Sequence, residues 1–476
     1  MNPSPGSLRD PGAVLLISCY ELGHQPLGLA WPRAFLERAG YAPDHLDLAI
    51  EPFDDRKAAR ARFAGIAVPM HTALRLGVRA AARIKRANPG CFICFYGLYA
   101  VLNADYLLNE VGDACLGGEF EGALIALLAE LGEGTRPRGP AQVSLQRQRY
   151  PLPARSGLVP LARYVHFARD DTRTPAGYVE ASRGCLHQCL HCPIPPVYGG
   201  RFVAVDRDTV LEDVRGLVAA GAGHITFGDP DFLNGPTHSA KLVRALHAEF
   251  PHVSWDCTTK IEHILKHRAL VTEWGRQGCA FIVSAVESTS DLVLAHLAKG
   301  HTRADVVAAL DVVRGAGITL RPSFVAFTPW TTLADYIDLL DFVATRDLTD
   351  EVDPVQFAIR LLVPPGSLLL ESAALKPYLG PLDPRALTYP WTHPDPRMDA
   401  LHAEVTRLVA QEASEPARVF DRVRTAAARA AGARPPEPSI SARRNSPRLT
   451  EPWFCCAEPT DTQLGAVADW DPGRWV

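Results

Sequence analysis

The sequence predicts an α/β protein with an N-terminal doubly wound domain, a second domain built as a partial (β/α)6 barrel, and a C-terminal helical and irregular tail. The chain has 476 residues, 47% of them hydrophobic, which exceeds what one ordinary core holds. Short apolar runs of strand length alternate with helical patterns in two blocks. A stretch rich in Pro, Arg and Gln, with no hydrophobic period, separates the blocks.

The first block covers residues 11–135 and is predicted to form a Rossmann-like domain. Its expected strands are residues 13–19, 45–50, 63–69 and 91–97, and its main helices are residues 26–40 and 73–90. Both helices end at Gly or Asn-Pro-Gly, which are common stop signals. Residues 112–131 are expected to add a strand, a turn and a helix, and residues 136–175 form the linker.

The second block covers residues 176–365 and repeats a strand–helix unit six times. The expected strands are residues 178–184, 224–230, 254–260, 281–287, 320–329 and 355–364. Six such units predict a TIM-type partial barrel, whose chemistry takes place at the carboxyl ends of the strands. Residues 366–476 are expected to be helical over residues 398–432 and irregular beyond them.

Charge and hydropathy exclude several functions. Charged residues make up 21% of the chain and the net charge is −4, so no basic surface indicates nucleic-acid binding. No apolar run reaches membrane-spanning length, and the first residues lack the pattern of a secretory signal. We therefore expect a cytoplasmic protein without a nucleic-acid or membrane partner. Its eleven cysteines are expected to be ligands, catalytic thiols or core residues, not disulfides.

Three cysteines follow the first expected strand of the second block in one short loop. Cys185, Cys189 and Cys192 have the spacing CxxxCxxC. Three thiolates can hold three irons of a 4Fe–4S cluster and leave the fourth iron open for a substrate or cofactor. The alternative is a zinc site that takes His187 or His191 as its fourth ligand.

The CxxxCxxC loop at the exit of the first strand of a six-unit βα domain resembles the radical S-adenosylmethionine (SAM) superfamily, over residues 177–365. That family often has an aromatic residue before the third cysteine, where this chain has His191. The resemblance implies a 4Fe–4S cluster that binds SAM and cleaves one of its carbon–sulfur bonds reductively. It also implies an electron donor such as flavodoxin or ferredoxin.

The resemblance further implies which residues bind SAM. Gly228, Asp229 and Asp231 occupy the place of the segment that receives SAM's amino group, and Glu287 that of a polar residue facing its ribose or methionine. The structural alternative is a strand-to-helix turn in which Asp231 has a local backbone role, and for Glu287 a surface turn. Strand-end cations are candidates for SAM's carboxylate, with structural ion pairs as the alternative. These cations are Lys260, Arg303, Arg321 and Arg360.

A doubly wound domain ahead of such a barrel resembles the cobalamin-binding class of radical SAM proteins. Residues 26–40 fit the first helix of such domains, and residues 117–131 fit their closing segment. The DxHxxG motif that supplies an axial histidine is absent, because His24 has other neighbours. The first domain is therefore expected either to bind cobalamin without a histidine ligand or to serve only for packing.

Two adjacent cysteines, Cys455 and Cys456, lie in the tail segment WFCCAEP. Adjacent cysteines rarely form an unstrained disulfide, whereas a pair of soft thiolates suits arsenic(III) and other thiophilic species. The segment resembles the tail of the CCAEP-tail radical SAM proteins. A related tail group belongs to arsinothricin biosynthesis, where the enzyme resembles a transferase of SAM's 3-amino-3-carboxypropyl group to arsenite.

The leading hypothesis is a radical SAM transferase acting on a small thiophilic substrate such as arsenite, which Cys455 and Cys456 hold. One alternative is a cobalamin-dependent radical SAM methyltransferase, or another adenosyl-radical enzyme, whose tail thiols are redox groups. Another is a non-catalytic iron–sulfur or soft-metal sensor. Retained SAM cleavage separates the enzymes from the sensor.

Overall fold

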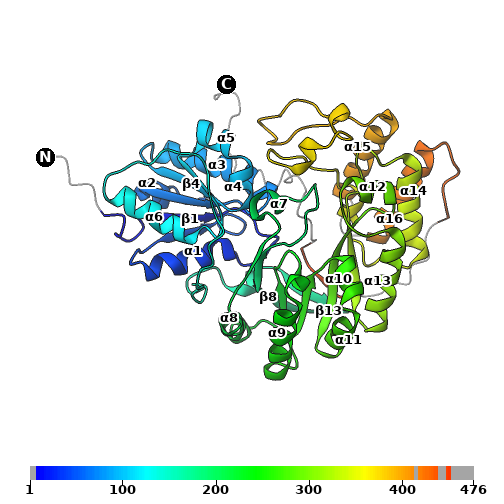
Figure 1. Ribbon diagram of the computed structural model, residues 1–476, viewed down its shortest axis with the longest axis horizontal. Helices are drawn as coiled ribbons and strands as arrows, with labels where there is room; N and C mark the ends of the chain where they lie inside the picture. Colours follow the sequence, from blue (N-terminus) through cyan, green and yellow to red (C-terminus); the bar gives the residue numbers. More distant parts are fainter. Residues whose placement is uncertain (1–6, 412–415, 438–445, 452–476) are drawn as a thin grey trace.

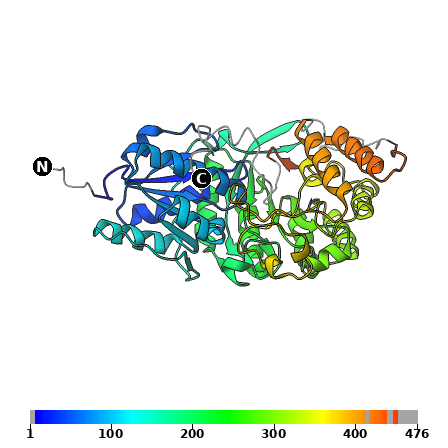
Figure 2. The same ribbon diagram turned by 90° about the horizontal axis from the view of Figure 1, so that it is seen from above.

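The fold is known from a computed structural model, which describes residues 7–411, 416–437 and 446–451. Two lobes lie side by side (Figures 1 and 2). The first domain forms the blue and cyan lobe, and the barrel with the C-terminal helices forms the green to orange lobe. None of the described helices is long and apolar enough to cross a membrane.

The first domain is built on a six-stranded parallel sheet in the order β2-β1-β3-β4-β5-β6. Its strands are β1 (Val14–Ser18), β2 (Asp44–Asp47), β3 (Phe63–Ala67), β4 (Phe92–Tyr96), β5 (Ala114–Gly118) and β6 (Gln142–Ser144). Every residue of β1, β3 and β4 is buried, as expected for strands covered on both faces. The chain reverses its direction of travel across the sheet between β1 and β3, where such folds bind ligands.

Helices cover both faces of this sheet, which confirms the predicted doubly wound class. They are α1 (Leu27–Arg38), α2 (Asp55–Arg60), α3 (His71–Ala87), α4 (Leu98–Leu102), α5 (Ala104–Tyr106) and α6 (Glu121–Gly132). The sheet takes β6 from the segment that the sequence assigned to the linker, because residues 142–144 pair with β5 along its free edge.

The second sheet has seven strands in the order β14-β13-β12-β11-β8-β7-β15. They are β7 (His166–Arg169), β8 (Thr172–Val179), β11 (His224–Phe227), β12 (Ser254–Thr258), β13 (Cys279–Glu287), β14 (Thr319–Phe324) and β15 (Arg448–Leu449). The five strands from β8 to β14 are parallel, whereas β7 and β15 add an antiparallel edge. The sheet curls into the predicted partial barrel, and β15 forms one of its edges.

The sixth barrel strand expected at residues 355–364 is not formed as a strand, and this prediction is wrong. Pro354–Phe357 is a 3₁₀ helix (η4), and the only ladder contact is an isolated parallel bridge between Phe327 and Arg360. The segment does not form a strand because prolines lie at both of its ends. Pro354, Pro364 and Pro365 have no N–H to donate to a neighbouring strand.

Helices pack on the convex side of the barrel sheet. They are α8 (Arg207–Ala219), α9 (Pro236–Glu249), α10 (Ile261–Lys266), α11 (Arg268–Arg276), α12 (Asp291–His296), α13 (Arg303–Gly315) and α14 (Leu333–Thr345). Capping boxes at Thr302 and Thr332 begin α13 and α14. Beyond the barrel, α15 (Pro396–Gln411) and α16 (Pro416–Ala430) form an antiparallel pair in the predicted helical region.

An aromatic group ties the barrel strands to their helices. The rings of Phe227 and Phe232 stack 4.5 Å apart, and Trp255 meets Trp274 edge-on at 5.3 Å. All four side chains are at most 1% exposed. Burying each of these side chains stabilises the fold by about 1.5–3 kcal/mol. They hold β11 and β12 firmly against the helices that cover them.

Candidate active site

The carboxyl ends of both sheets face one cavity of about 280 Å³, here called the central cavity. The first domain contributes residues that follow β1, β3 and β4, namely Leu22, His24, Pro69, Met70, Leu98 and Tyr99. The barrel contributes the three loop cysteines and residues from each of its parallel strands. Because both folds present reactive groups at these strand ends, the cavity is the candidate active site.

Cys185, Cys189 and Cys192 line the central cavity together, as the sequence predicted. Cys185 and Cys189 are buried, and burial raises the pKa of the Cys185 thiol. The loop begins at Gly184, whose φ of +78° and close contact with the Arg201 carbonyl leave no room for a Cβ. Three uncrosslinked thiols on one short loop are the donor set that a 4Fe–4S cluster with one open iron requires.

A buried ion pair lies beside the cysteine loop. The Lys299 ammonium donates to the Glu287 carboxylate at 3.1 Å, and the His191 imidazole lies 3.2 Å from the same oxygen. Burial alone would raise the pKa of Glu287, but Lys299 and His191 lower it to about 2. Burial would lower the pKa of Lys299, yet Glu287 and Cys189 raise it. The site therefore holds an ionised Lys299–Glu287 pair next to the thiols.

Gly228 and Asp229 lie on the wall of the central cavity, whereas Asp231 does not. A Cβ at Gly228 would overlap the Tyr178 phenol, so this position requires glycine. The Asp229 carboxylate accepts the Ala181 N–H at 2.9 Å and the Ser182 hydroxyl, and burial raises its pKa to about 7. These bonds clamp the end of β11 to the segment that follows β8.

Asp231 is buried beside the cysteine loop. It accepts the Thr259 hydroxyl at 2.7 Å and lies close to His187 and His263. Burial alone would raise the pKa of Asp231, but the two imidazoles and the hydroxyl hold it well below its usual range. The structure therefore places Asp231 with these histidines and not with the SAM-facing wall.

Two of the predicted arginines, Arg303 and Arg321, have different places. Arg303 begins α13, pairs with Asp338 on α14 and is outside the set of residues that line the central cavity. Arg321 lies on β14 and lines the cavity, and its guanidinium pairs with Asp353 at 2.7 Å. Its guanidinium also reaches the Pro447 carbonyl at 3.4 Å, so it contacts the last described segment of the chain.

Residues 446–451 run along the edge of the barrel and end in the cavity wall. β15 pairs with β7, Ser446 donates to Glu351 at 3.0 Å, and the Tyr20 hydroxyl donates to Glu451 at 2.6 Å. Leu449 and Glu451 line the central cavity together with the three loop cysteines. Cys455 and Cys456 lie outside the described residues, four and five positions beyond Glu451.

A second cavity of about 240 Å³ adjoins the carboxyl ends of β1, β3, β4 and β5. Its wall includes Glu21, which accepts the N–H groups of Leu27 and Gly28 at 3.0 and 2.9 Å at the start of α1. Burial, with Glu180 nearby, raises the pKa of Glu21 to about 8. The first domain therefore keeps an acidic group in its mostly protonated form at neutral pH.

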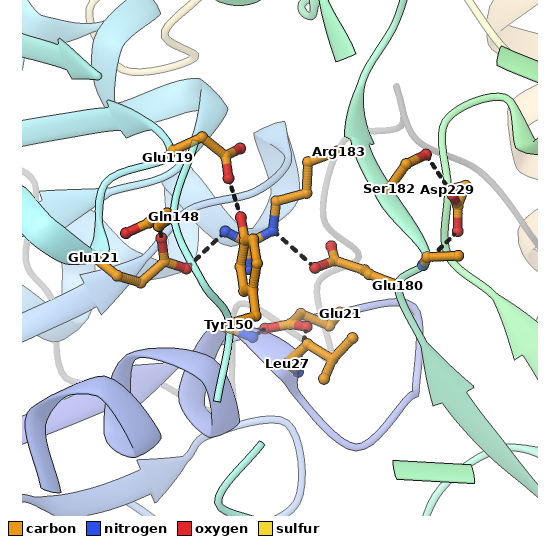
Figure 3. Close-up of polar contacts among 12 residues, drawn as sticks. Glu21, Leu27, Glu119, Glu121, Gln148, Tyr150, Glu180, Ser182, Arg183 and Asp229 are labelled. Carbon is orange, nitrogen blue, oxygen red and sulfur yellow. Dashed lines mark hydrogen bonds and ion pairs between the residues drawn. The ribbon is translucent and has the colours of Figure 1, made fainter. Parts of the chain in front are cut away.

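Arg183 joins the two domains beside this second cavity (Figure 3). It donates to Glu121 of the first domain at 2.6 Å and to Glu180 of the barrel at 2.9 Å. The neighbouring Glu119 accepts the hydroxyls of Tyr150 and Tyr198, and burial raises its pKa to about 7. One buried cation thus lies among several carboxylates where the domains meet.

Glu21 is expected to make a contribution to stability that decreases as the pH rises. Its folded pKa of about 8 lies above the ordinary value of 4.5, so the protonated form is the one that favours folding. This contribution is complete below the unfolded pKa and is lost as the pH rises through the folded pKa. The melting temperature measured from about pH 5.5 to 8.5 should therefore fall less steeply in Glu21→Gln than in the wild type.

The exposed Glu133 provides the control, since Glu133→Gln should keep the wild-type slope. Glu119 and Asp229 shift in the same direction, so some slope should remain in Glu21→Gln. Identical slopes in Glu21→Gln and the wild type would contradict the assignment.

Sequence reasoning missed three residues of this site. Lys299 lies in a loop after α12 and Arg183 lies in the short strand Ser182–Gly184, and only their partners mark them as part of the site. Glu451 lies in a proline-rich tail with no periodicity. The one sequence signal was the position of Arg183, two residues before the first cysteine of the motif.

Comparison with known proteins agrees with this geometry. Residues 179–343 match the model of the radical SAM superfamily. An uncharacterised methyltransferase of Pyrococcus horikoshii is 24% identical over 61% of this chain and 64% of its own length. The hopanoid C-3 methylase of Methylococcus capsulatus is 25% identical over 64% of this chain and 62% of its own length. The chain thus spans less than two thirds of the length of either relative.

Two solved structures resemble this fold. The cobalamin-dependent SAM radical enzyme OxsB, solved with aqua-cobalamin bound, superposes with a TM-score of 0.64 at 14% identity, over 83% of this chain and 66% of its own. The radical SAM methyltransferase TsrM of Kitasatospora setae, solved with cobalamin and a 4Fe–4S cluster, gives 0.57 at 17% identity, over 70% and 73%. At these identities the likeness establishes the fold.

The loop of three cysteines at the mouth of a βα barrel and the match over residues 179–343 define the class of protein. The chain carries a radical SAM domain, preceded by a doubly wound domain of the kind found in OxsB and TsrM.

Proposed function

We propose that this protein cleaves SAM reductively and transfers its 3-amino-3-carboxypropyl group to a small thiophilic substrate, with arsenite as the candidate acceptor. The observation that supports the proposal is the position of residues 446–451, the last described segment of the chain. Leu449 and Glu451 form part of the wall of the same cavity as the three cluster cysteines. The tail thus leaves the described fold at the site where SAM would react.

Each part of the cavity has a role in this reaction. Cys185, Cys189 and Cys192 would hold the cluster, which when bound supplies the electron that breaks a carbon–sulfur bond of SAM. Lys299, fixed by Glu287, offsets the negative charge of the thiolates. The apolar side chains that line the cavity, Phe227, Phe281, Val283 and Phe324, exclude water from the reacting groups.

The tail would supply the binding site for the acceptor. β15 and the bonds of Ser446 and Glu451 fix the chain as far as the cavity wall. Cys455 follows Glu451 by only four positions in the sequence. Two adjacent thiolates suit arsenic(III), because soft metalloids prefer sulfur ligands. A hydroxide or a further cysteine would complete the arsenic site.

The overall reaction balances with two electrons. One SAM cation, one As(OH)₃, two electrons and one proton give 5′-methylthioadenosine, water and a carbon-bonded arsenic(III) species with two hydroxyls. The sulfonium–carbon bond breaks, an arsenic–carbon bond forms, and one hydroxide leaves as water. The electrons come from a low-potential one-electron donor such as flavodoxin or ferredoxin.

The test is anaerobic reconstitution with iron and sulfide, then reduction with SAM, with and without arsenite, analysed by mass spectrometry. We expect 5′-methylthioadenosine that increases with arsenite, together with an organoarsenic product. In Cys455→Ser/Cys456→Ser, SAM cleavage should remain while the product is lost, because the acceptor is no longer held. Cys91→Ser, in a buried cysteine of the first domain, should retain product formation.

Unchanged product yield in the Cys455→Ser/Cys456→Ser variant would end the proposal for the tail. SAM binding without any cleavage would favour an iron–sulfur sensor. Dominant 5′-deoxyadenosine with no arsenite effect would favour the usual adenosyl-radical chemistry.

A second candidate function is cobalamin-dependent methyl transfer. The buried His24 imidazole lines the central cavity, stacks on Tyr178 at 4.3 Å, and has no hydrogen-bond partner for its Nδ1 among the described residues. The His24 nitrogen on the first-domain side of the cavity could face a corrinoid cofactor. The structural neighbours OxsB and TsrM were solved with cobalamin bound, which supports the same function. In the same reconstitution, corrinoid absorbance retained after desalting would favour this function.

A further inference from the structure

A cluster of two histidines and two carboxylates lies beside the cysteine loop, and its His187 also lines the central cavity. His187 belongs to the loop, Asp231 follows β11, and Glu262 and His263 lie on α10. His187, Glu262 and His263 each place one ligand atom within 4.8 Å of the other two. Three segments that are far apart in sequence thus meet in a set of nitrogen and oxygen donors.

Three donor atoms in this cluster are buried and have no hydrogen-bond partner among the described residues. They are His187 Nε2, Asp231 Oδ2 and His263 Nδ1. The Asp231 side chain is only 1% exposed, so water does not solvate its second oxygen. A buried polar atom without a partner costs about 1–3 kcal/mol, and three in one place indicate a group that is bound there.

The spacing of these atoms also suits ligands that share one metal ion. Asp231 Oδ2 lies 3.4 Å from His187 Nε2 and 2.8 Å from His263 Nδ1. Ligands of a tetrahedral zinc ion lie about 3.3 Å apart, because each bond is about 2.0–2.1 Å long. The three atoms can therefore act as ligands of one zinc ion.

The surroundings complete the arrangement expected around a metal. The Glu262 carboxylate lies 2.9 Å from His187 Nδ1, which leaves Nε2 as the free ligand atom. The other Asp231 oxygen accepts the Thr259 hydroxyl at 2.7 Å and the Leu233 N–H at 3.1 Å. Metal-binding histidines commonly donate their second N–H to a carboxylate, and ligating carboxylates are held by further bonds.

We propose that His187, Asp231 and His263 bind a zinc ion that is separate from the iron–sulfur cluster, with Glu262 orienting His187. Two imidazoles and a carboxylate suit zinc, and a water would complete a tetrahedral site. The ion joins the cysteine loop to β11 and α10, and so fixes the loop that carries Cys185 and Cys189. This site does not depend on the proposed transfer reaction.

The test measures metal content and coordination in the reconstituted full-length enzyme. After addition of one equivalent of zinc and desalting, zinc and iron are counted by mass spectrometry and the zinc shell is determined by X-ray absorption. We expect about one zinc per chain with nitrogen and oxygen ligands near 2.0–2.1 Å. His263→Gln and Asp231→Asn should each lower zinc retention at least roughly tenfold while iron content is unchanged.

His252→Gln, in an exposed histidine before β12, is the matched control and should keep its zinc. Sulfur ligands near 2.3 Å would place the zinc on cysteines and overturn the proposal. Wild-type enzyme that retains no zinc, or variants that retain as much as the wild type, would also overturn it.

Discussion

Replacing Cys185, Cys189 and Cys192 together by Ala is expected to reduce SAM cleavage to the uncatalysed background. The three thiols line one cavity and are the donor set for the cluster that the radical SAM domain requires. Without them no iron is retained, and no electron reaches SAM. The measurement is iron and sulfide content, the brown absorbance, and the yield of adenosine products after anaerobic reduction.

A core cysteine provides the control for this triple change. Cys279 is buried at the start of β13, at the end of the barrel away from the cavity. Cys279→Ala should lose some stability by leaving a small void, but it should keep its iron and its SAM cleavage. If the triple variant still cleaved SAM, the cluster assignment would be refuted.

Replacing Arg183 by Met is expected to have the largest effect on stability. Arg183 lies between Glu121, whose side chain is fully buried, and Glu180, so its removal leaves uncompensated buried carboxylates. Breaking a buried ion pair by deleting one partner costs about 3–5 kcal/mol. Denaturant titration should show this loss in the free energy of unfolding, and the two domains should separate more readily.

Two further variants test the electrostatic cause. Arg207→Met removes a solvent-exposed arginine that pairs with Asp208, and its effect should stay within about 1 kcal/mol. Arg183→Met combined with Glu121→Gln should recover part of the lost stability, because one unpaired charge is gone. An additive loss in the double variant would contradict a direct interaction between these two side chains.

Features that depend on neighbours in sequence were predictable. The alternation of apolar runs and helical patterns gave both α/β domains, since burial of strands and amphipathic helices follows a short period. The spacing of Cys185, Cys189 and Cys192 predicted a cluster site, because ligands on one short loop depend little on the rest of the chain, and the structure places the three thiols on one cavity. The strand expected at residues 355–364 does not form, although the segment is apolar, because prolines lie at both of its ends.

Features that depend on distant segments were decided by the tertiary structure. Asp231 and Arg303 had suitable positions at strand or helix ends, yet Asp231 turned toward His187 and His263, and Arg303 toward Asp338. The pairing of β15 with β7 brings Glu451 to the cavity across more than 280 residues of chain. Such contacts result from many small packing and electrostatic terms summed over the whole fold. The sequence by itself therefore determined the class of chemistry, and the packing of the two domains decided which side chains surround it.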